Sequence, residues 1–412
     1  MSMQADSPLD WLMSTQSRGI FPGLQRMERL LKALGNPEQR LRCLHVAGTN
    51  GKGSVCAMSE SVLRAAGYRT GLYTSPHLVD FSERIRVNGE NATATALEEG
   101  IQRLREVTQG WEGAEQPTFF ELVTALAFAH FDREGCEIVV LETGLGGRLD
   151  ATNTAPKMAC AITPIALDHT EWLGGTLAEI AREKAGIFRS GIPAVIAPQE
   201  EEAGKSLDDA ARDLSTPCHW VTEALDAGLV PGLTGSHQRW NAAVALDLIR
   251  VAGFQITPEE SARGLAGVTW PGRFQRLLGG KLILDGAHNP HAARQLVAVW
   301  REEFGSERCR LIFGALMDKD PSSLLRILAP VANEVLVVPV ASARSADPKL
   351  LAQSVTDLPL PVHVYPSLAA AMEHLEKRTH ALEAPVLLAG SLFLVGEALA
   401  LMSGRGVTLR SQ

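Results

Sequence analysis

The chain has 412 residues, of which 45% are hydrophobic and 21% charged, so it is long enough for two domains and has the composition of a globular protein in water. Its formal net charge of −8 argues against a nucleic-acid or acidic-membrane partner held by bulk charge. Its six cysteines are scattered with no C-x-x-C pair, which argues against a disulfide framework and against a zinc site.

Targeting and membrane signals are not evident in the sequence. Residues 1–10 are polar and include acids, unlike a signal peptide. No apolar stretch approaches the roughly 20 residues that a membrane span needs. We therefore expect a cytoplasmic protein with no membrane or nucleic-acid partner, and nothing in the sequence demands more than a monomer.

From residue 43 onward, short apolar runs alternate with amphipathic stretches, which predicts an α/β fold with mostly parallel sheets. The strands expected in the first part of the chain are residues 44–47, 138–141 and 159–163. The helices expected there are residues 54–66, 119–133 and 176–185. Gly67 is expected to cap the first of these helices.

A second series of strands separated by helical stretches begins near residue 280. Its strands are expected at residues 282–284, 311–313, 335–338, 362–365 and 386–389. This doubly wound pattern is long enough for a domain of its own. A segment rich in glycine and proline precedes it, so we predict domains at 1–272 and 281–412 with a linker at 273–280.

Residues 46–54 read Val-Ala-Gly-Thr-Asn-Gly-Lys-Gly-Ser, so a predicted strand runs into a glycine-rich turn and then a helix. Glycines let backbone N–H groups approach phosphate oxygens, and the helix N-terminus adds positive potential. Lys52 can reach the β- and γ-phosphates of a nucleotide, and Ser54 can ligate Mg²⁺. The turn departs from G-x-x-x-x-G-K-[ST], because Gly53 separates the lysine from the hydroxyl residue.

The alternative is a glycine-rich turn with a solvated lysine. The order of strand, loop, lysine, hydroxyl and helix favours nucleotide binding over that alternative. The predicted fold class is therefore α/β, with an N-terminal P-loop ATPase-like domain on a mostly parallel sheet and a smaller C-terminal Rossmann-like domain.

Polar residues follow other predicted strands, where α/β proteins place ligand-binding loops. Ser75 follows one strand, although an ordinary Ser-Pro turn explains that segment taken alone. Glu142 directly follows the apolar run 138–141, where a carboxylate can hold Mg²⁺ beside the phosphate loop. The glycines after it carry Arg148 and Asp150 on one loop. A flexible surface loop would explain the glycines but not these charged residues.

Four further polar residues have open interpretations. His169 is expected at another strand end, where a structural and a ligand role are about equally supported. Lys184 lies near a helix end, where a lysine is normally a solvated cap partner. Asp285 follows a strand of the second series and can accept from a ribose hydroxyl or bind an ion. Arg273 can bring positive charge to a phosphate, or be a plain linker arginine.

Six segments in this order resemble the folylpolyglutamate synthase/dihydrofolate synthase family, which is related to the Mur ligases. The resemblance runs from about residue 9 to residue 396, and Gly53 in the phosphate loop is normal for that family. The matching segments are residues 47–54, 75–78, 144–153, 167–170, 183–187 and 285–291.

The resemblance implies cofactors and roles for individual residues. The implied cofactors are ATP and Mg²⁺ at two sites, with Ser75 and Glu142 matching ligands of one ion and His169 a ligand of the second. Lys184 matches a lysine that the family carboxylates on its side-chain nitrogen, which would turn a cation into an anion. Lys52, Lys184 and His169 are thus the catalytic candidates. The positions that match nucleotide-binding residues are Thr49, Asn50, Gly51, Lys52, Gly53, Ser54, Asn241, Arg273 and Asp285.

The resemblance also implies a pterin-binding region. Residues 19–22 fall in that region, but they lack the acidic residue of the family version. The positions that match pterin-binding residues are Thr118, Phe119, Phe120, Glu121, Leu149, Asp150 and Ala151.

The implied activity is ATP-dependent ligation of L-glutamate to dihydropteroate and to the γ-carboxylates of reduced folates, through an acyl phosphate. One alternative is a folylpolyglutamate synthase without dihydropteroate activity. A second is a Mur-type ligase acting on a nucleotide-linked peptide, which usually carries an extra N-terminal substrate domain. A third is a nucleotide-binding module with no ligase chemistry, which leaves the second domain unexplained.

Overall fold

The computed structural model describes residues 7–19, 21–226, 228–378 and 384–404. The chain divides into two compact units. Unit 1 comprises Met1–His77, Ser82–Gly232 and Arg239–Val268, and unit 2 comprises Leu78–Phe81, Leu233–Gln238 and Thr269–Gln412. Two short segments that precede residue 269 therefore belong to unit 2, so no single boundary along the chain separates the two units.

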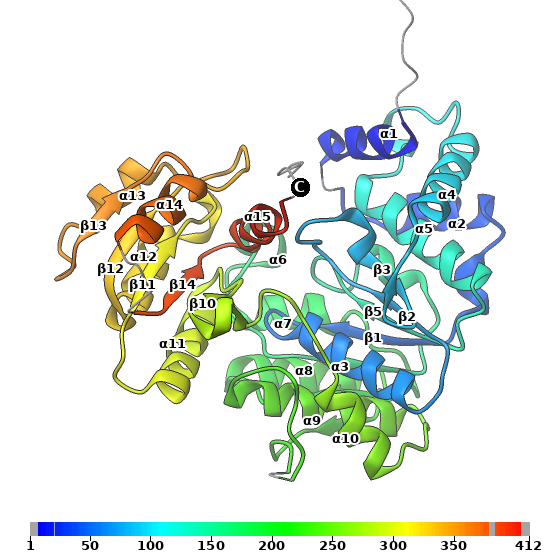
Figure 1. Cartoon of the computed structure of the whole chain (residues 1–412). Helices are drawn as coiled ribbons and strands as arrows, with labels where there is room; N and C mark the ends of the chain where they lie inside the picture. Colours follow the sequence, from blue (N-terminus) through cyan, green and yellow to red (C-terminus); the bar gives the residue numbers. More distant parts are fainter. Residues whose placement is uncertain (1–6, 20, 227, 379–383, 405–412) are drawn as a thin grey trace, which may run out of the picture. The chain divides into compact units, whose positions relative to one another are not determined.

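The described residues of unit 1 form an eight-stranded sheet in the order β4-β3-β2-β5-β1-β6-β7-β8 (Figure 1). Neighbouring strands are parallel, except that β3 is antiparallel to both β2 and β4. The strands are β1 Cys43–Ala47, β2 Thr70–Tyr73, β3 Ile85–Val87, β4 Glu90–Asn91, β5 Ile138–Glu142, β6 Ala159–Ile162, β7 Ala194–Ile196 and β8 Cys218–Trp220.

Helices cover the centre of this sheet. Every residue of β1, β5 and β6 is buried, as expected of parallel strands with both faces covered. Helix α3 packs on β1, β2 and β5, and α10 packs on α3. The helices up to residue 268 are α1 Pro8–Ser14, α2 Gln25–Ala33, α3 Lys52–Ala65, α4 Ala94–Val107, α5 Phe119–Arg133, α6 Thr170–Leu173, α7 Leu177–Ala185, α8 Glu201–Asp213, α9 Ser236–Val251 and α10 Pro258–Ala266.

Unit 2 contains a six-stranded sheet in the order β13-β12-β11-β14-β10-β9, counted over its described residues. Its neighbouring strands are parallel except for the β9–β10 pair. The strands are β9 Gln275–Leu277, β10 Leu282–Leu284, β11 Cys309–Phe313, β12 Ala332–Val337, β13 Val362–Val364 and β14 Val386–Ala389. The helices are α11 Pro290–Phe304, α12 Pro321–Leu328, α13 Pro348–Ser354, α14 Leu368–Arg378 and α15 Leu392–Met402.

The sheet of unit 2 has a separate hydrophobic cluster on each face. Successive side chains of a strand point to opposite faces. Leu311 and Phe313 of β11 accordingly join one cluster, together with residues of α11, α12 and α13. Ile312, between them, joins the other cluster with residues of α14 and α15. Both faces are therefore covered, which explains why these strands read as continuous apolar runs.

The predicted α/β class and its two mostly parallel sheets are confirmed. Helix α5 has the predicted bounds, because Thr118 caps it with a capping box to Glu121. The helix expected at 54–66 begins earlier, at Lys52, because Gly51 takes the cap position with a φ of 89°. The helix expected at 176–185 begins at Leu177, with Thr176 as its cap.

Two details of the predicted strands are corrected by the structure. Glu142 does not follow its strand but is the last residue of β5. His169 does not lie at a strand end, because β6 ends at Ile162 and His169 caps the short helix α6 instead.

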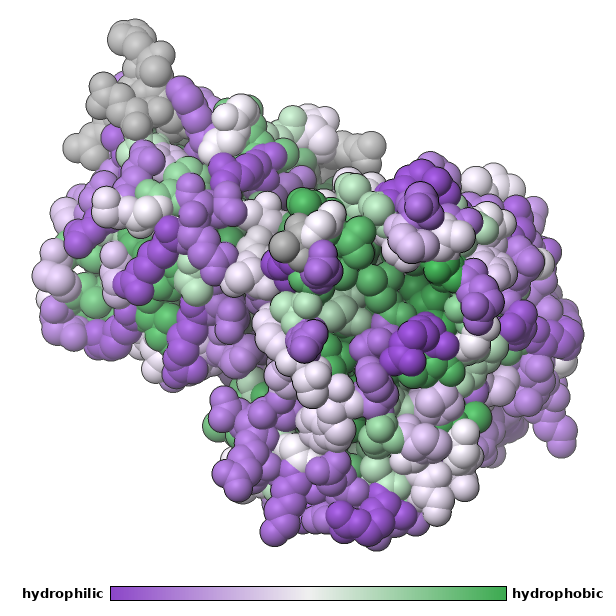
Figure 2. Space-filling view, turned by 90° about the horizontal axis from the view of Figure 1, so that it is seen from below, coloured by the Kyte–Doolittle hydropathy of each residue, from purple (hydrophilic) through white to green (hydrophobic). Residues whose placement is uncertain are grey.

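None of the helices in the described ranges combines the length and apolar character that a membrane span requires. The face in Figure 2 carries hydrophilic side chains around smaller hydrophobic areas. All six cysteines are free thiols. Of residues 19–22, Ile20 lies outside the described residues.

Candidate active site

Residues 48–54, called here the phosphate loop, run from the end of β1 through the first three residues of α3 in unit 1. Gly48 and Gly51 have φ values of 146° and 89°, which favour glycine. A Cβ on Gly48 would lie 1.8 Å from Thr163 Oγ1, and a Cβ on Gly51 would lie 2.6 Å from Asn241 Oδ1. Both positions therefore require glycine, and Asn241 of α9 lies directly against the turn, as a nucleotide-binding role requires.

The start of α3 offers groups that suit a phosphate. Val55 N–H closes the first turn on the carbonyl of Gly51, so the N–H groups before it have no partner within the helix. The hydroxyl of Ser54 is buried and has no hydrogen-bond partner among the described residues. A buried hydroxyl without a hydrogen-bond partner lowers the stability of the fold, unless a bound ligand provides that partner. Its position at the head of the helix fits Mg²⁺ or a phosphate oxygen.

Two lysines from different elements reach the phosphate loop. Lys52 Nζ lies 3.2 Å from the carbonyl oxygen of Thr49, and Lys184 Nζ lies 2.7 Å from that of Gly48. Lys184 is only 4% exposed. Burial, and secondly the charge of Lys52, lower the pKa of Lys184 to about 7, although nearby carboxylates including Asp168 oppose this effect.

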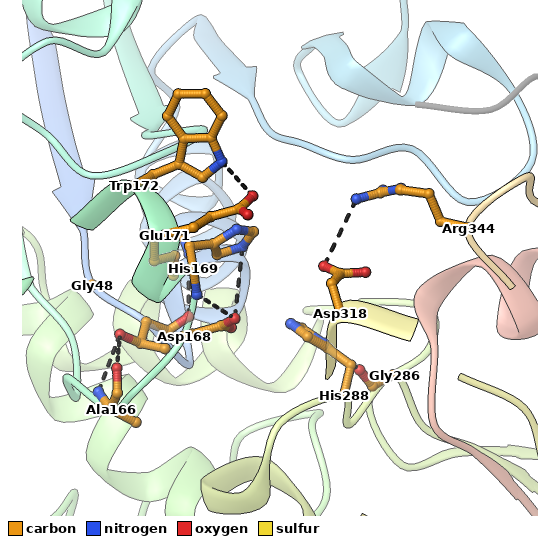
Figure 3. A network of polar contacts seen from close by, with 12 residues as sticks. Gly48, Ala166, Asp168, His169, Glu171, Trp172, Gly286, His288, Asp318 and Arg344 are labelled. Carbon is orange, nitrogen blue, oxygen red and sulfur yellow. Dashed lines mark hydrogen bonds and ion pairs between the residues drawn. The ribbon is translucent and has the colours of Figure 1, made fainter. Parts of the chain in front are cut away.

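The other side of the loop is tied to the segment after β6. The backbone N–H groups of Thr49 and Asn50 both donate to the carbonyl oxygen of Pro164 at 3.1 Å. The hydroxyl of Thr49 donates to the carbonyl oxygen of Ala166 at 3.2 Å and accepts from its N–H at 3.1 Å (Figure 3). These contacts fix the start of the loop before any nucleotide is bound.

His169 lies three residues beyond Ala166, the residue to which the Thr49 hydroxyl is hydrogen-bonded. Its backbone is left-handed, with a φ of 52°, and its side chain is 44% exposed. Its Nε2 lies 3.8 Å from Oδ1 of Asp168, and its backbone N–H donates to the same oxygen at 2.9 Å (Figure 3). Asp168 also acts electrostatically on Lys184. The segment thus holds an exposed imidazole close to the lysine side of the phosphate loop.

Glu142 and Ser75 meet at the ends of the neighbouring strands β5 and β2. Glu142 is 6% exposed, and its Oε2 accepts from the backbone N–H of Ser75 at 3.2 Å. Across the described ranges, no group of three or more His, Cys, Asp or Glu side chains could hold a metal ion. Mg²⁺ usually binds one or two protein oxygens together with water and substrate phosphates. The oxygens of Ser54, Ser75 and Glu142 fit that mode rather than an all-protein cage.

The predicted pterin-binding residues at the start of α5 lie against the loop that leads to the other predicted segment, Leu149 to Ala151. A Cβ on Gly144 would lie 2.4 Å from the ring of Phe120, so the start of α5 touches the loop after β5. We call residues 144–150 the glycine loop. Asp150 holds it closed, because its Oδ2 accepts from the N–H groups of Gly144 and Leu145 at 2.9 and 2.8 Å. Leu149 is 36% exposed beside buried Ala151.

Glu121 is already occupied by two structural contacts. Its Oε2 accepts from the backbone N–H of Thr118 at 2.7 Å, which completes the cap of α5. Both carboxylate oxygens also face Arg26, at 3.1 Å from Nε and 3.1 Å from Nη2. Glu121 therefore sets the start of α5 and so the position of Phe119 and Phe120.

The remaining predicted residues belong to unit 2. Asp285 follows β10 and accepts from the backbone N–H groups of Phe274 and Ala287 at 2.8 and 2.9 Å. Burial raises the pKa of Asp285, and the neighbouring charge of Arg273 is the strongest opposing influence. In the same unit, His288 Nδ1 lies 2.9 Å from the carbonyl oxygen of Gly286 (Figure 3). Arg273 and Asp285 therefore form one polar group.

The sequence assigned no role to Arg84, which is 2% exposed in unit 1. Its Nε lies 2.8 Å from Nδ1 of His77, and its guanidinium lies 5.5 Å from the ring centre of Phe119. Burial lowers its pKa to about 10. The signal in the sequence is an arginine directly before the short strand β3, but only the fold shows that this arginine turns inward.

Two family models match the chain. Residues 46–223 match the Mur ligase middle domain, and residues 272–392 match the Mur ligase, glutamate ligase domain. The chain is 36% identical over 358 residues to the dihydrofolate synthase/folylpolyglutamate synthase of Bacillus subtilis, covering 79% of this chain and 83% of that one. It is also 36% identical over 425 residues to a probable bifunctional folylpolyglutamate synthase/dihydropteroate synthase of Haloferax volcanii, but spans only 50% of that longer protein.

Solved structures agree with the sequence comparison. The chain matches Escherichia coli FolC in complex with DHPP and ADP, with a TM-score of 0.84, 32% identity, and coverage of 98% of this chain and 99% of that one. It matches the Yersinia pestis bifunctional folylpolyglutamate synthase/dihydrofolate synthase complexed with AMPPNP and Mn ion, with a TM-score of 0.86, 31% identity, and coverage of 98% and 100%.

Proposed function

Because the chain belongs to the dihydrofolate synthase/folylpolyglutamate synthase family of the Mur ligases, we propose that it joins L-glutamate to dihydropteroate and to the γ-carboxylates of reduced folates. It is an ATP-dependent acid–amino-acid ligase. The observation that supports this most directly is the buried Ser54 hydroxyl, which has no partner among the described residues and lies at the head of α3 beside two loop lysines.

The reaction needs activation of a poor electrophile. A carboxylate oxygen attacks the γ-phosphorus of ATP and ADP leaves, giving an acyl phosphate. The amine of glutamate then attacks the acyl carbon, loses a proton, and expels phosphate that carries the former carboxylate oxygen. Catalysis of phosphoryl transfer rests mainly on positioning and on neutralising negative charge.

The chain's own residues supply both requirements. The first turn of α3 binds phosphate oxygens through backbone N–H groups that have no partner within the helix. Lys52 neutralises the transferring phosphoryl group, and Asn241 holds the nucleotide from beside Gly51. The glycine loop and Phe120 hold the pterin end of the substrate, because they lie against each other. Arg273 and Asp285 remain predicted nucleotide contacts.

Mg²⁺ is part of the proposal. Ser54, Ser75 and Glu142 offer oxygens for one ion, and the exposed imidazole of His169 offers a nitrogen for a second. When bound, these ions supply charge neutralisation on the phosphate oxygens. The structural relative from Yersinia pestis was solved with AMPPNP and an Mn ion, which supports a divalent cation at such a site.

Carboxylation of Lys184 is a further part of the proposal. Only an unprotonated amine attacks CO₂, and a lysine whose pKa is about 7 is substantially unprotonated at neutral pH. The product is a carbamate anion, formed with loss of one proton. An anion at Lys184 would remove the electrostatic repulsion between Lys184 and Lys52 and would favour the binding of a metal ion nearby.

Phosphate release tests the proposed function directly. With purified protein, ATP and Mg²⁺, we expect phosphate release only when glutamate and a pterin acid are both present. Equal release without either acceptor would support a nucleotide-binding module instead. The same assay separates the bifunctional enzyme from a folylpolyglutamate synthase, because only the former turns over dihydropteroate as well as tetrahydrofolate.

The remaining partners follow from this activity. ATP, glutamate, dihydropteroate and reduced folates are small molecules, so we propose a monomer that acts on them in the cytoplasm without a nucleic-acid partner. The six free thiols, five of them buried, suit a reducing compartment.

A further inference from the structure

A chain of buried polar side chains lies behind the glycine loop. His45, on β1, is fully buried, and Lys157, just before β6, is 8% exposed. Lys157 Nζ lies 3.1 Å from Nδ1 of His45, and Nε2 of His45 lies 2.8 Å from Thr152 Oγ1. The hydroxyl of Thr152 donates to Oδ1 of Asp150. Lys157 is thereby connected to the acid that holds the glycine loop closed.

The direction of these hydrogen bonds follows from the donors available. Thr152 has one hydroxyl hydrogen, which it gives to the carboxylate, so Nε2 of His45 must donate to Thr152. A neutral imidazole has a single N–H, so its Nδ1 accepts from Lys157. His45 is neutral, because burial and secondly the charge of Lys157 hold its pKa well below the ordinary value. These hydrogen bonds therefore all point in one direction, from the ammonium group of Lys157 to the carboxylate of Asp150.

Lys157 has two more acceptors. Its Nζ lies 2.6 Å from Oδ1 of Asn153 and 3.3 Å from the carbonyl oxygen of Ile187. With His45, these make three acceptors for the three hydrogens of an ammonium group. A neutral amine has only two hydrogens and must give up one of these three bonds, although Oδ1 of Asn153 also accepts from Nη2 of Arg189 at 3.1 Å. Lys157 therefore makes all three of its hydrogen bonds only when it is charged.

Asn153 carries the connection to the end of α7. Its side-chain Nδ2 donates to the carbonyl oxygens of Arg148 and Gly186, each at 3.0 Å. Gly186 directly follows α7, the helix that carries Lys184. Lys157 is thus linked on one side to the closed glycine loop and on the other to the element that brings Lys184 to the phosphate loop.

The surroundings of Lys157 make its charge sensitive to pH. Its three hydrogen-bond partners are uncharged. Burial, and secondly the positive charge of Arg189, lower its pKa to about 7, and these effects exceed the opposing influence of Cys160, Cys43 and Asp150. The group that completes the network therefore titrates near neutral pH.

We propose that Lys157 is a positioning residue for the pterin-type substrate, because its ammonium group fixes the glycine loop against the end of α7 through His45, Thr152 and Asn153. The inference rests on the proposed function, which assigns pterin binding to the glycine loop. Lys157 is buried behind that loop and acts through it. Its loss should therefore change the affinity for the pterin acid. The phosphate loop should be unaffected, because it is held separately by Pro164 and Ala166.

The test compares Lys157→Met with Lys205→Met, which removes an exposed lysine of α8. In Lys157→Met we expect the KM for dihydropteroate to rise about tenfold, the effect of losing one buried hydrogen-bonding group. The kcat, the KM for ATP and the affinity for ADP should match those of Lys205→Met. In the wild type the KM for dihydropteroate should rise as the pH passes above 7, whereas in Lys157→Met it should be flat.

An unchanged KM in a Lys157→Met variant that still binds ADP would overturn the inference. If that variant does not bind ADP, the test is made with Thr152→Val. This substitution removes the hydroxyl that joins His45 to Asp150, and it does not remove a charge. A raised KM for dihydropteroate then supports the inference and an unchanged KM overturns it. When both variants fold, their double mutant should show less than the sum of the two effects, and an additive result would contradict the connection.

The wild type separates failure of this inference from failure of the proposed function. If the wild type does not turn over dihydropteroate, the bifunctional part of the proposed function is wrong. The same comparison of variants is then made with tetrahydrofolate as the pterin-type acid.

Discussion

The side-chain nitrogen of Lys184, at the end of α7, lies 2.7 Å from the carbonyl oxygen of Gly48, the first residue of the phosphate loop. A lysine in the last turn of a helix is normally solvated, but this one is buried because α7 packs beneath the loop after β1. Two lysines therefore converge on one turn. Burial, and secondly the repulsion between the two ammonium groups, lower the pKa of Lys184, which is the physical reason to expect chemistry there.

Removal of Lys184 should abolish dependence on CO₂. The wild type should lose activity in buffer depleted of CO₂ and bicarbonate and recover when they are restored. Lys184→Met should have a kcat lower by roughly 10²-fold, the scale of losing one preorganised charge at a reacting centre, and should not respond to bicarbonate. With ¹³CO₂, a carbamate resonance should be visible by NMR in the wild type only. Its presence in Lys184→Met would place the modification elsewhere.

Ser54 and Ser59 provide a matched pair on α3. Both hydroxyls are buried and lack a hydrogen-bond partner among the residues that the structure describes. Replacing either by alanine should leave stability nearly unchanged, since no hydrogen bond is lost. Only Ser54→Ala should lower kcat, by roughly 10²-fold, because only this hydroxyl lies at the phosphate loop. Equal kcat and KM values in the two variants would show that the Ser54 hydroxyl has no role in the reaction.

Gly51 and Gly67 separate backbone strain from crowding. Their φ values are nearly equal, at 89° and 91°, but a Cβ on Gly51 would lie 2.6 Å from Asn241 whereas a Cβ on Gly67 meets nothing within 4 Å. Alanine at either position should destabilise the protein by about 1 kcal/mol through strain. Only Gly51→Ala should also raise the KM for ATP, because Asn241 must move. Thermal unfolding and ATP titration measure the two effects separately.

The free energy of unfolding should depend on the charge of Lys157. Folded Lys157 releases its proton near pH 7, whereas in the unfolded chain it keeps the proton to about its ordinary pKa of 10.5. Between these values the unfolded state binds more protons, so raising the pH stabilises the folded state. The slope is at most about 1.4 kcal/mol per pH unit for one lysine. Urea unfolding at pH 7 to 9 should show a smaller slope for Lys157→Met than for the wild type, and equal slopes would be inconsistent with the lowered pKa.

Much of the fold was predictable because its signals are local. The capping residue Thr118 and the apolar run that follows it give α5 its bounds, and the buried strands of both sheets read as short apolar runs. The phosphate loop was predictable for the same reason, since strand, glycines, lysine, hydroxyl and helix are contiguous. The placement of Leu78–Phe81 in unit 2 was not, because it depends on contacts with residues far along the chain.

The candidate site was predictable only where its residues share a segment. Pattern alone could not distinguish Lys184 from a solvated lysine, because its burial depends on how α7 packs. The connection from Lys157 through His45 to Thr152 joins positions more than 100 residues apart. No spacing rule links such positions, and each residue alone reads as ordinary.

The route through an acyl phosphate is tested most directly by following oxygen. Dihydropteroate carrying ¹⁸O in its carboxylate is incubated with the purified protein, ATP, Mg²⁺ and glutamate, and the released phosphate is analysed by mass spectrometry. We predict one ¹⁸O atom in the phosphate for each amide bond formed. Amide formation with unlabelled phosphate would contradict the account.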